Sequence, residues 1–243
     1  MLGLGLNSSL TASNRFTYVN KYSLSFDNTN DVVSLESSGL RGALNNGDFE
    51  ETGSISVWAK FVTTTDNGMV CDFAIDANNR IFILYKHSND TISCSYRAGG
   101  TTKIASLDPS GVEGEGWFHI AFTWDSTGTA KAYIDAATAV TNSISSLTWS
   151  GNWDSATVDL GESNSGGSDF WGFATDFAVF DRELTATEIT NIYNGGKPQD
   201  ETSKDPIAYW RIEEGTGSTI TDISSGKDYS GTISGAAWST DIP

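Results

Sequence analysis

The chain has 243 residues and a formal net charge of −17 at pH 7, with 38% hydrophobic and 12% aromatic residues. This apolar content is enough to fill a core, and the length is ordinary for one large β-sheet domain, which argues against long disordered segments. Only 14 Lys and Arg are scattered among 31 Asp and Glu, so no nucleic-acid partner is expected. No apolar stretch approaches the length of a membrane span, so no membrane partner is expected either.

Residues 1–20 are interpreted as a polar, weakly patterned N-terminal arm outside the main domain. No basic residue precedes Arg15, and the apolar run is too short and too rich in glycine for a secretory signal. Export by the ordinary route is therefore not supported by this segment.

The segments before residue 100 show the alternation that is typical of β-strands. Residues 21–35 predict a strand, a turn and a short second strand, and residues 51–62 predict a third strand. Residues 68–98 predict a three-stranded meander with Cys71 and Cys94 on its outer strands. Outer strands lie roughly 9 to 10 Å apart, beyond the reach of a disulfide, so both thiols are expected to be free, as in a reducing compartment.

The clearest pattern in the chain is a hairpin over residues 117–135. Its first strand places four large apolar side chains on one face, Phe118, Ile120, Phe122 and Trp124. A turn follows at residues 125–128, and the return strand carries small residues opposite the large ones. A hairpin with one face this apolar needs a second sheet over it, so the pattern predicts a sandwich.

After the hairpin, residues 146–163 predict a loop with two tryptophans that leads into a short strand at residues 157–161. Residues 170–180 predict a later strand, in which Phe173, Phe177 and Val179 are expected to share one face.

The ends of one short helix can be read from the sequence. Thr185 as N-cap and Glu188 three residues later make a capping box, and Gly195 can close the other end. A helix is therefore expected near residues 185–194, as a plug over one end of the sandwich.

Three segments together resemble one superfamily. SLSFDNTNDVVSL at residues 23–35, WFHIAFTWDSTGTAKAYID at 117–135 and FATDFAVFDRELTATEITNIYNGG at 173–196 are similar, in this order, to motifs of the laminin-G-like, concanavalin A-like jelly-roll superfamily. The resemblance implies an all-β fold, a two-sheet antiparallel jelly-roll sandwich formed by residues 21–243. This fold occurs in lectins, glycanase accessory modules, adhesion domains and viral surface proteins, so it does not by itself define the function.

The end of the chain resembles the beginning of such domains. After a charged linker at residues 195–206, the segment 207–243 contains IAYWRIEEGTG and the loop DISSGKDYSGT. This segment is too apolar for a solvated tail. We therefore expect residues 207–243 to supply closing strands, either to their own sandwich or by exchange to a neighbour, which would form a homo-oligomer.

The resemblance also implies a structural calcium ion. Asp222, Ser225 and Asp228 fall on a loop that resembles a calcium-binding turn in some relatives. Asp176 falls on the late strand, where relatives usually carry Asp then Glu and this chain has Thr175 then Asp176, so that one ligand is missing. The expected ligand set is thus Asp176, Asp222, Ser225 and Asp228, and the alternative is that these are turn residues that bind no metal.

Sugar binding needs a flat aromatic face beside polar groups, because an indole stacks on the apolar face of a pyranose while amides and carboxylates bind its hydroxyls. The loops offer four candidates, Trp149, Asn152, Trp153 and Trp171. The alternative for each tryptophan is burial, since a sandwich of this size encloses several large aromatic residues.

Catalysis has little support in the sequence. A GxSxG elbow, a phosphate-binding glycine loop, a His-rich metal set and the acidic strand of laminarinases are all absent. His119 is expected to pack or to make a simple hydrogen bond, and Asp159 with Glu162 is a pairing expected by chance in an acidic chain. The protein is therefore predicted not to be an enzyme.

Three classes of function remain. The first is a structural or adhesion protein of a tailed-phage virion, located in the head decoration, the tail or the fibre. Its expected partners are other virion proteins or identical subunits, and cell-surface polysaccharide is an additional expected partner. The alternatives are a secreted or cell-surface carbohydrate-binding, lectin-like module at an extracellular location, and a glycanase. The virion class is preferred at this stage because the resemblance is to stand-alone domains encoded by such phages.

Overall fold

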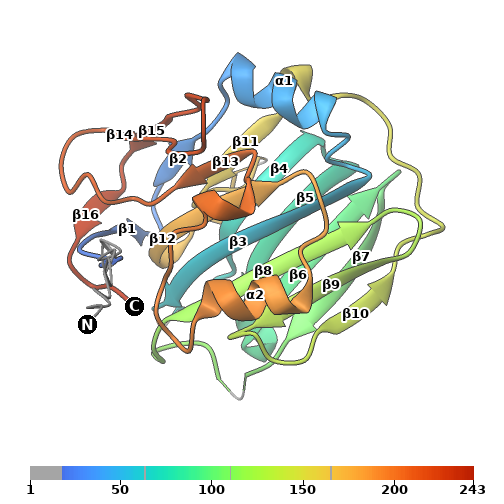
Figure 1. The fold of residues 1–243 in the computed structure, drawn as a ribbon. Helices are drawn as coiled ribbons and strands as arrows, with labels where there is room; N and C mark the ends of the chain where they lie inside the picture. Colours follow the sequence, from blue (N-terminus) through green and yellow to red (C-terminus); the bar gives the residue numbers. More distant parts are fainter. Residues whose placement is uncertain (1–17, 63, 110, 165) are drawn as a thin grey trace, which may run out of the picture.

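The computed structural model describes residues 18–62, 64–109, 111–164 and 166–243, which form a sandwich of two antiparallel sheets with eight strands each (Figure 1). Sheet A has the order β10 (Val140–Ser143), β9 (Thr129–Ile134), β8 (Phe118–Asp125), β3 (Thr52–Phe61), β12 (Trp171–Phe180), β1 (Ser23–Asp27) and β16 (Ala237–Ser239), with β13 (Ala208–Trp210) also paired to β12. Sheet B has the order β14 (Thr219–Ile220), β15 (Gly231–Ser234), β2 (Val32–Ser34), β11 (Thr157–Leu160), β4 (Gly68–Asp76), β5 (Asn79–Lys86), β6 (Thr91–Ala98) and β7 (Thr101–Leu107). The predicted all-β jelly-roll sandwich is confirmed.

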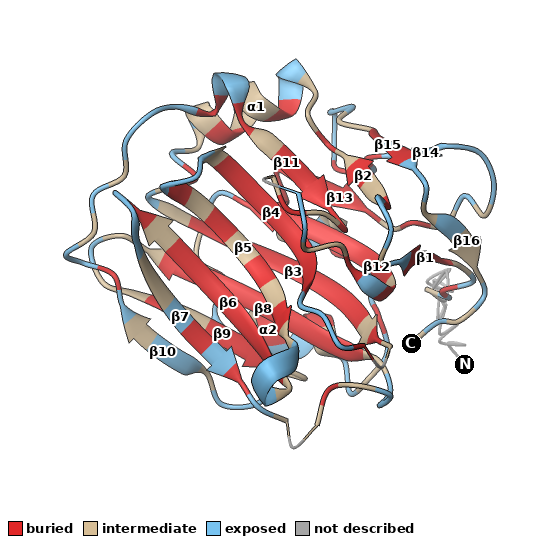
Figure 2. Ribbon diagram, turned by 180° about the vertical axis from the view of Figure 1, so that it is seen from behind, coloured by how far each residue is buried: buried red, intermediate tan, exposed pale blue. Residues whose placement is uncertain are grey.

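The core lies between the two sheets, and buried positions follow their middle strands (Figure 2). The predicted hairpin is confirmed as β8 and β9, whose register pairs Phe122 with Ala132 and Trp124 with Ala130, so that large side chains face small ones. The Trp124 indole donates from Nε1 to the carbonyl of Phe49 at 2.7 Å, which satisfies its polar atom inside the core.

The described part of the chain has two α-helices on the sandwich, where the sequence predicted one. Helix α2 (Ala186–Tyr193) has the expected capping box between Thr185 and Glu188, and its buried side packs a second apolar cluster onto the outer face of sheet A. Helix α1 (Ser38–Asn46) was not predicted, because two glycines weaken its intrinsic propensity. Burial of Leu40 and Leu44 stabilises it instead. Neither helix is long and apolar enough to cross a membrane.

Strand β12 contains a β-bulge, and the prediction that Phe173 shares a face with Phe177 and Val179 is wrong for this reason. Its register against β3 shifts between Thr175 and Ala178, and Asp176 has a φ of 47°. The extra residue moves Phe177 and Val179 to the core side that Ala174 occupies before the bulge. Phe173 therefore does not share their face, as strict alternation predicted, and its ring contacts the Trp117 ring on the outer surface at a centroid distance of 6.3 Å.

Both cysteines are free, as predicted, and buried. Cys71 on β4 and Cys94 on β6 both lie opposite Ile83 of the intervening strand β5. Burial raises the pKa of both thiols, so neither is a reactive thiolate.

The C-terminal segment is built into both sheets. β13 pairs with β12, β16 pairs with β1, and β15 pairs with β2, all within this chain. Three short 3₁₀-helices complete the structure, at His87–Asn89, Trp153–Ser155 and Thr202–Lys204. Homo-oligomerisation stays a prediction.

Asp222 organises the C-terminal segment. Its Oδ1 accepts from the backbone N–H groups of Tyr209 and Ser224 at 3.0 and 2.9 Å. Its Oδ2 accepts from the Ser224 hydroxyl at 3.0 Å and from the Tyr229 backbone N–H at 3.1 Å. One buried carboxylate thus connects β13 to the loop that follows β14.

Replacing Asp222 with Ala should lower the free energy of unfolding by about 2 to 4 kcal/mol, because it leaves buried donors without an acceptor. The control is Asp228→Ala, which removes an exposed carboxylate bonded only to Ser230 and should change stability by less than about 0.5 kcal/mol. Chemical denaturation of both variants in millimolar calcium and in chelator checks this. A loss seen only with calcium would show instead that Asp222 acts through a metal.

The outer face of sheet B places acidic residues opposite each other. Asp159 on β11 pairs with Asp72 on β4, and Asp72 is compensated by Arg80, whose Nε lies 3.0 Å from its Oδ1. Burial, followed by the charges of Glu36 and Glu162, raises the pKa of Asp159 to about 7. The unfolded chain therefore loses this proton first, and the stability that the neutral carboxyl provides is lost as the pH rises from 3.8 to about 7.

Replacing Asp159 with Asn should therefore stabilise the protein at pH 8 and leave it nearly unchanged at pH 4. We expect a gain of about 2 kcal/mol at the higher pH, which is less than the full pKa shift implies because the carboxyl keeps some access to solvent. Thermal denaturation at the two pH values measures the difference. Equal effects at both values would contradict the raised pKa.

Candidate functional site

Trp171, the first residue of β12, is the only aromatic side chain in the described part of the chain that is classed as exposed, with 38% of its surface accessible. Strand alternation puts it on the outer face of sheet A together with Phe173, while Phe170 before it is buried in the core. An exposed indole on a rigid central strand is a stable platform for stacking.

Three loops meet beside Trp171. Its carbonyl accepts from the N–H of Val62, where the loop after β3 begins, and Asp27 pairs with it at the end of β1. The third loop runs directly into Trp171 through Phe170, whose carbonyl accepts from the Asn28 N–H at 3.0 Å. Backbone pairing therefore brings together loops from three distant parts of the chain.

A polar pocket of about 320 Å³ lies between these loops. It is lined by amides, carboxylates, a hydroxyl and a glycine, from Asn28, Asp66, Asn67, Gly167, Ser168 and Asp169. Asp169 accepts from the Asn30 N–H at Oδ2, whereas its buried Oδ1 has no hydrogen-bond partner among the described residues. The pocket thus combines several donors and acceptors with one unused buried acceptor.

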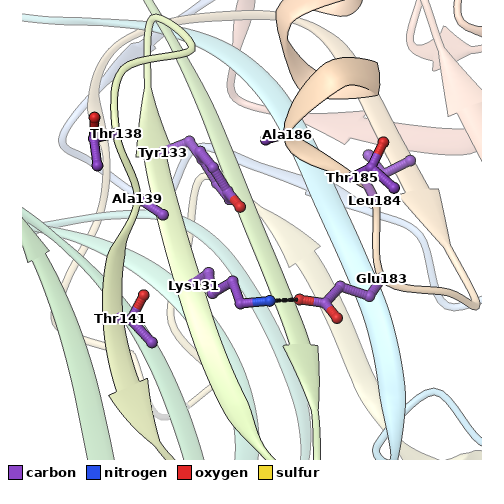
Figure 3. A pocket seen from close by; sticks show the side chains of 9 residues that line it. All are labelled: Lys131, Tyr133, Thr138, Ala139, Thr141, Glu183, Leu184, Thr185 and Ala186. Atoms are coloured by element: carbon purple, nitrogen blue, oxygen red, sulfur yellow. Dashed lines mark hydrogen bonds and ion pairs between the residues drawn. The ribbon is translucent and has the colours of Figure 1, made fainter.

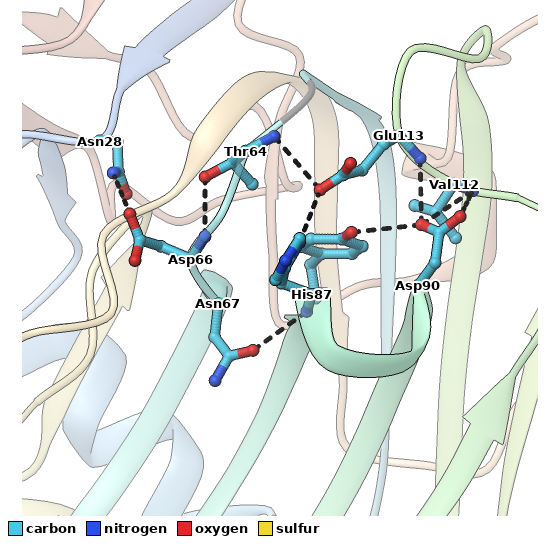
Figure 4. A network of polar contacts seen from close by, with 9 residues as sticks. Asn28, Thr64, Asp66, Asn67, His87, Asp90, Val112 and Glu113 are labelled. Carbon is cyan, nitrogen blue, oxygen red and sulfur yellow. Dashed lines mark hydrogen bonds and ion pairs between the residues drawn. The ribbon is translucent and has the colours of Figure 1, made fainter.

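The loop after β3 is held in place by neighbouring polar groups (Figure 4). Asn28 donates from Nδ2 to Asp66 at 3.5 Å, and Asn67 accepts from the His87 N–H at 3.0 Å. Glu113 Oε1 accepts from the Thr64 N–H at 3.2 Å and lies 3.4 Å from the His87 Nδ1. These contacts fix the polar rim before any ligand binds.

The lining residues were not predicted from the sequence, which pointed only to Trp171 at this site. The available signal was compositional, since NTND at residues 28–31 and SNSGGSD at residues 163–169 are rich in turn-forming polar residues. That signal cannot show which loops come together.

The other three predicted sugar-binding residues form a separate group. Trp149 is half-buried against the rings of Tyr96 and Trp153 at 5.5 and 5.6 Å. Trp153 is fully buried and donates from Nε1 to Glu50 Oε2 at 2.7 Å, so it is a core residue and cannot stack on a sugar. Asn152 is exposed and accepts from the N–H of Asp154 as the N-cap of a 3₁₀-helix.

This group and Trp171 lie at opposite ends of β5. Asn79 begins β5 and donates to the Ser150 hydroxyl at 3.2 Å, next to Trp149. His87 follows the end of β5 and contacts Asn67 of the polar pocket. The four predicted residues therefore do not form one site.

A larger concavity of about 500 Å³ lies between β9, β10 and the loop before α2 (Figure 3). Its two charged groups neutralise each other, because Lys131 Nζ lies 2.5 Å from Glu183 Oε1. The hydrogen bond from this pair raises the pKa of Lys131, which keeps the ion pair intact at neutral pH. No aromatic ring faces solvent strongly here, since Tyr133 is buried.

The four predicted calcium ligands lie in different surroundings, and calcium binding stays a prediction. Asp222 already accepts four hydrogen bonds from the protein, while Ser225 and Asp228 are exposed. Asp176 is fully buried on β12, where the Tyr209 hydroxyl donates to it at 2.7 Å. Among the described residues, no group of three or more His, Cys, Asp and Glu side chains is arranged to hold a metal.

Asp176 accepts hydrogen bonds from the first described residues and from β13. The Asn20 amide and the hydroxyls of Tyr18 and Tyr209 all donate to its carboxylate. Burial raises its pKa well above the usual range. The bulge residue of β12 therefore anchors residues 18–20 to sheet A.

His119 behaves as the sequence predicted. It is fully buried, its Nε2 lies 3.0 Å from the Ser56 hydroxyl, and burial lowers its pKa to about 3. The ring is neutral at physiological pH and lies outside the polar pocket, so it supplies no acid or base there.

Comparisons with known proteins agree with this geometry. A family model described as the concanavalin A-like lectin/glucanases superfamily matches residues 27–190. No curated protein gives a significant match. Among solved structures, a candidate carbohydrate-binding protein from Bacteroides ovatus has a TM-score of 0.62 at 14% identity, and the match covers 93% of this chain and 61% of that one.

Two further structures show the same fold. The heptameric SAP-like pentraxin from Limulus polyphemus has a TM-score of 0.52 at 17% identity, covering 74% of this chain and 86% of that one. Domain 4 of an extracellular arabinanase from Geobacillus stearothermophilus, solved with arabinotriose, has a TM-score of 0.50 at 20% identity, covering 59% of this chain and 66% of that one. At these identities the structural likeness establishes the fold alone. With a family model that spans residues 27–190 and a sandwich that agrees with it, the chain belongs to the concanavalin A-like lectin/glucanase superfamily.

Proposed function

We propose that the protein is a non-enzymatic glycan-binding module whose site is Trp171 with the adjoining polar pocket. Two observations carry the proposal: the Trp171 indole is exposed, and its backbone pairs with the ends of loops that line a pocket of six residues rich in amides and carboxylates. An indole covers the apolar face of a sugar ring, while amide and carboxylate groups exchange hydrogen bonds with its hydroxyls.

The arrangement suits binding of an extended polysaccharide at its surface. The pocket volume of about 320 Å³ lies at the lower end of the usual range of ligand pockets. Beside Trp171, the outer face also carries Phe173 under Lys60 Nζ, which lies 5.6 Å from the ring centroid. Lys60 in turn contacts Asp241 at 2.7 Å, and Asp241 accepts from Trp117 Nε1 at 2.9 Å. Further sugars of a chain can follow this surface.

Similar structures support the same class of function. The Bacteroides ovatus protein is a candidate for carbohydrate binding, and the arabinanase domain was solved with arabinotriose. Neither comparison favours catalysis by this chain. His119 is buried away from the pocket, and His87, at its rim, contacts Asn67 and Glu113 of the protein.

The virion location, the virion partners and the extracellular alternative stay predictions from the sequence. Detection of the protein in purified particles would support the virion location. Detection only in culture medium would support the extracellular one.

Replacing Trp171 with Ala should weaken binding to a recognised polysaccharide by about tenfold to a hundredfold, or about 1.4 to 2.8 kcal/mol, because the stacking surface is removed. The melting temperature should change little, since the side chain is exposed. Binding is measured on an array of bacterial surface polysaccharides and then by calorimetry.

The matched control is Ile104→Ala on β7, which removes an equally exposed apolar side chain from sheet B and should leave binding unchanged. Asp169→Asn keeps the volume of the side chain and should also weaken binding. Loss of binding on Trp149→Ala with full binding by the Trp171 variant would place the site at the other end of β5 and contradict this proposal.

A further inference from the structure

A second pocket lies apart from Trp171 and shares no residue with the polar pocket. Its volume is about 600 Å³, and it is lined by Tyr18, Val19, Lys21, Tyr22, Asp200, Arg211 and Glu213. This volume lies within the range of small-molecule sites. The lining contains two phenol rings, two cationic groups and two carboxylates.

Both carboxylates already have partners in the protein. The two oxygens of Glu213 each lie 3.0 Å from the Lys21 backbone N–H, and one of them also accepts from the Tyr22 N–H. Asp200 Oδ1 accepts from the N–H and the hydroxyl of Thr202 at 2.9 and 2.6 Å. Backbone and hydroxyl donors thus occupy part of the hydrogen-bonding capacity of both carboxylates.

The two cationic groups are in the opposite situation. Among the described residues, neither the Arg211 guanidinium nor Lys21 Nζ has a hydrogen bond or an ion pair, and Arg211 Nε is buried without a partner. Arg41, Arg80 and Arg182, in contrast, each contact a carboxylate. Arg97 shares this lack of an ion pair among the described residues, but Arg211 lines the pocket. Asp176 and Glu213 act on Arg211 electrostatically without a direct contact, so the guanidinium donors remain available for a ligand.

Arg211 is nevertheless held in position. Its guanidinium lies over the Tyr18 ring, 4.0 Å from the centroid, and the Tyr18 hydroxyl lies 2.8 Å from that of Tyr209. The Arg211 carbonyl accepts from the Thr175 hydroxyl at 3.0 Å, and the next residue, Ile212, adopts a φ of 60°. A β-branched residue rarely adopts this conformation. The surrounding packing therefore fixes the path of the backbone at Arg211, directly after β13 ends.

We propose that this pocket is a second binding site that accepts the carboxylate of an acidic sugar between Arg211 and Lys21. A guanidinium binds a carboxylate through two parallel N–H donors, and stacking on Tyr18 orients that fork in advance. The Tyr18 and Tyr22 rings lie beside the sugar, and the remaining lone pairs of Asp200 and Glu213 accept from its hydroxyls. A singly charged carboxylate suits the site better than a phosphate group, because two wall carboxylates repel a second negative charge.

The proposal is independent of the Trp171 site and is tested on the full chain by calorimetric titration. The probes are glucuronic acid and N-acetylneuraminic acid, with glucose and N-acetylglucosamine as neutral controls. The acidic sugars should bind, with affinity that falls as the salt concentration rises, and the neutral sugars should bind at least tenfold more weakly. Equal affinity for acidic and neutral sugars, or no binding of either acid at millimolar concentration, would overturn the proposal.

Variants then assign the site. Arg211→Gln should weaken binding of the acids at least tenfold, Arg211→Lys should recover only part of this loss because it lacks the fork, and Trp171→Ala should have no effect. If Arg211→Gln lowers the melting temperature, Lys21→Gln at an exposed position provides the second measurement and should also weaken binding. Unchanged binding by both variants, or equal competition by inorganic sulfate, would overturn the assignment to an acidic sugar.

Discussion

The pairing of β12 with β3, β1 and β13 is the interaction on which the rest of the structure depends. These four strands come from the start, the first third, the second half and the end of the chain, and they meet in the middle of sheet A. Trp171 begins β12. The loops that flank it are brought together because the neighbouring strands terminate at the same end of sheet A. The bulge at Asp176 lies on the same strand and allows β13 to pair beyond it. Both proposed sites are therefore consequences of the pairing of one strand.

Carboxylates serve in this protein chiefly as hydrogen-bond acceptors for its own backbone and side chains. Asp222 accepts four donors in the C-terminal segment, and Asp176 accepts three from residues 18–20 and β13. The loop that resembles a calcium-binding turn is thus ordered by hydrogen bonds from the protein's own donors. Amide donors and a divalent ion satisfy the same lone pairs, so the pattern of acidic residues cannot distinguish the two.

The two proposed sites differ in the physical basis of recognition. At the proposed Trp171 site, recognition rests on the apolar face of an exposed ring and on the neutral and acceptor groups of the adjoining pocket. At Arg211 it comes from cationic donors that have no partner in the protein.

The sequence by itself determined the elements that depend on near neighbours. The hairpin of β8 and β9, the capping box of Thr185 and Glu188, and the free thiols of Cys71 and Cys94 follow from alternation, local hydrogen bonding and strand spacing. Only the tertiary structure decided which side chains are accessible and which loops meet. In the linear sequence Trp153 and Trp171 look alike, since each is a tryptophan in a polar loop region. Trp153 is enclosed by Phe49 and Glu50, which lie more than one hundred residues earlier in the chain, whereas Trp171 is exposed. The same holds for helix α1, for the bulge at Asp176 and for the pocket around Asp169, since each is stabilised by contacts between distant segments that no local pattern records.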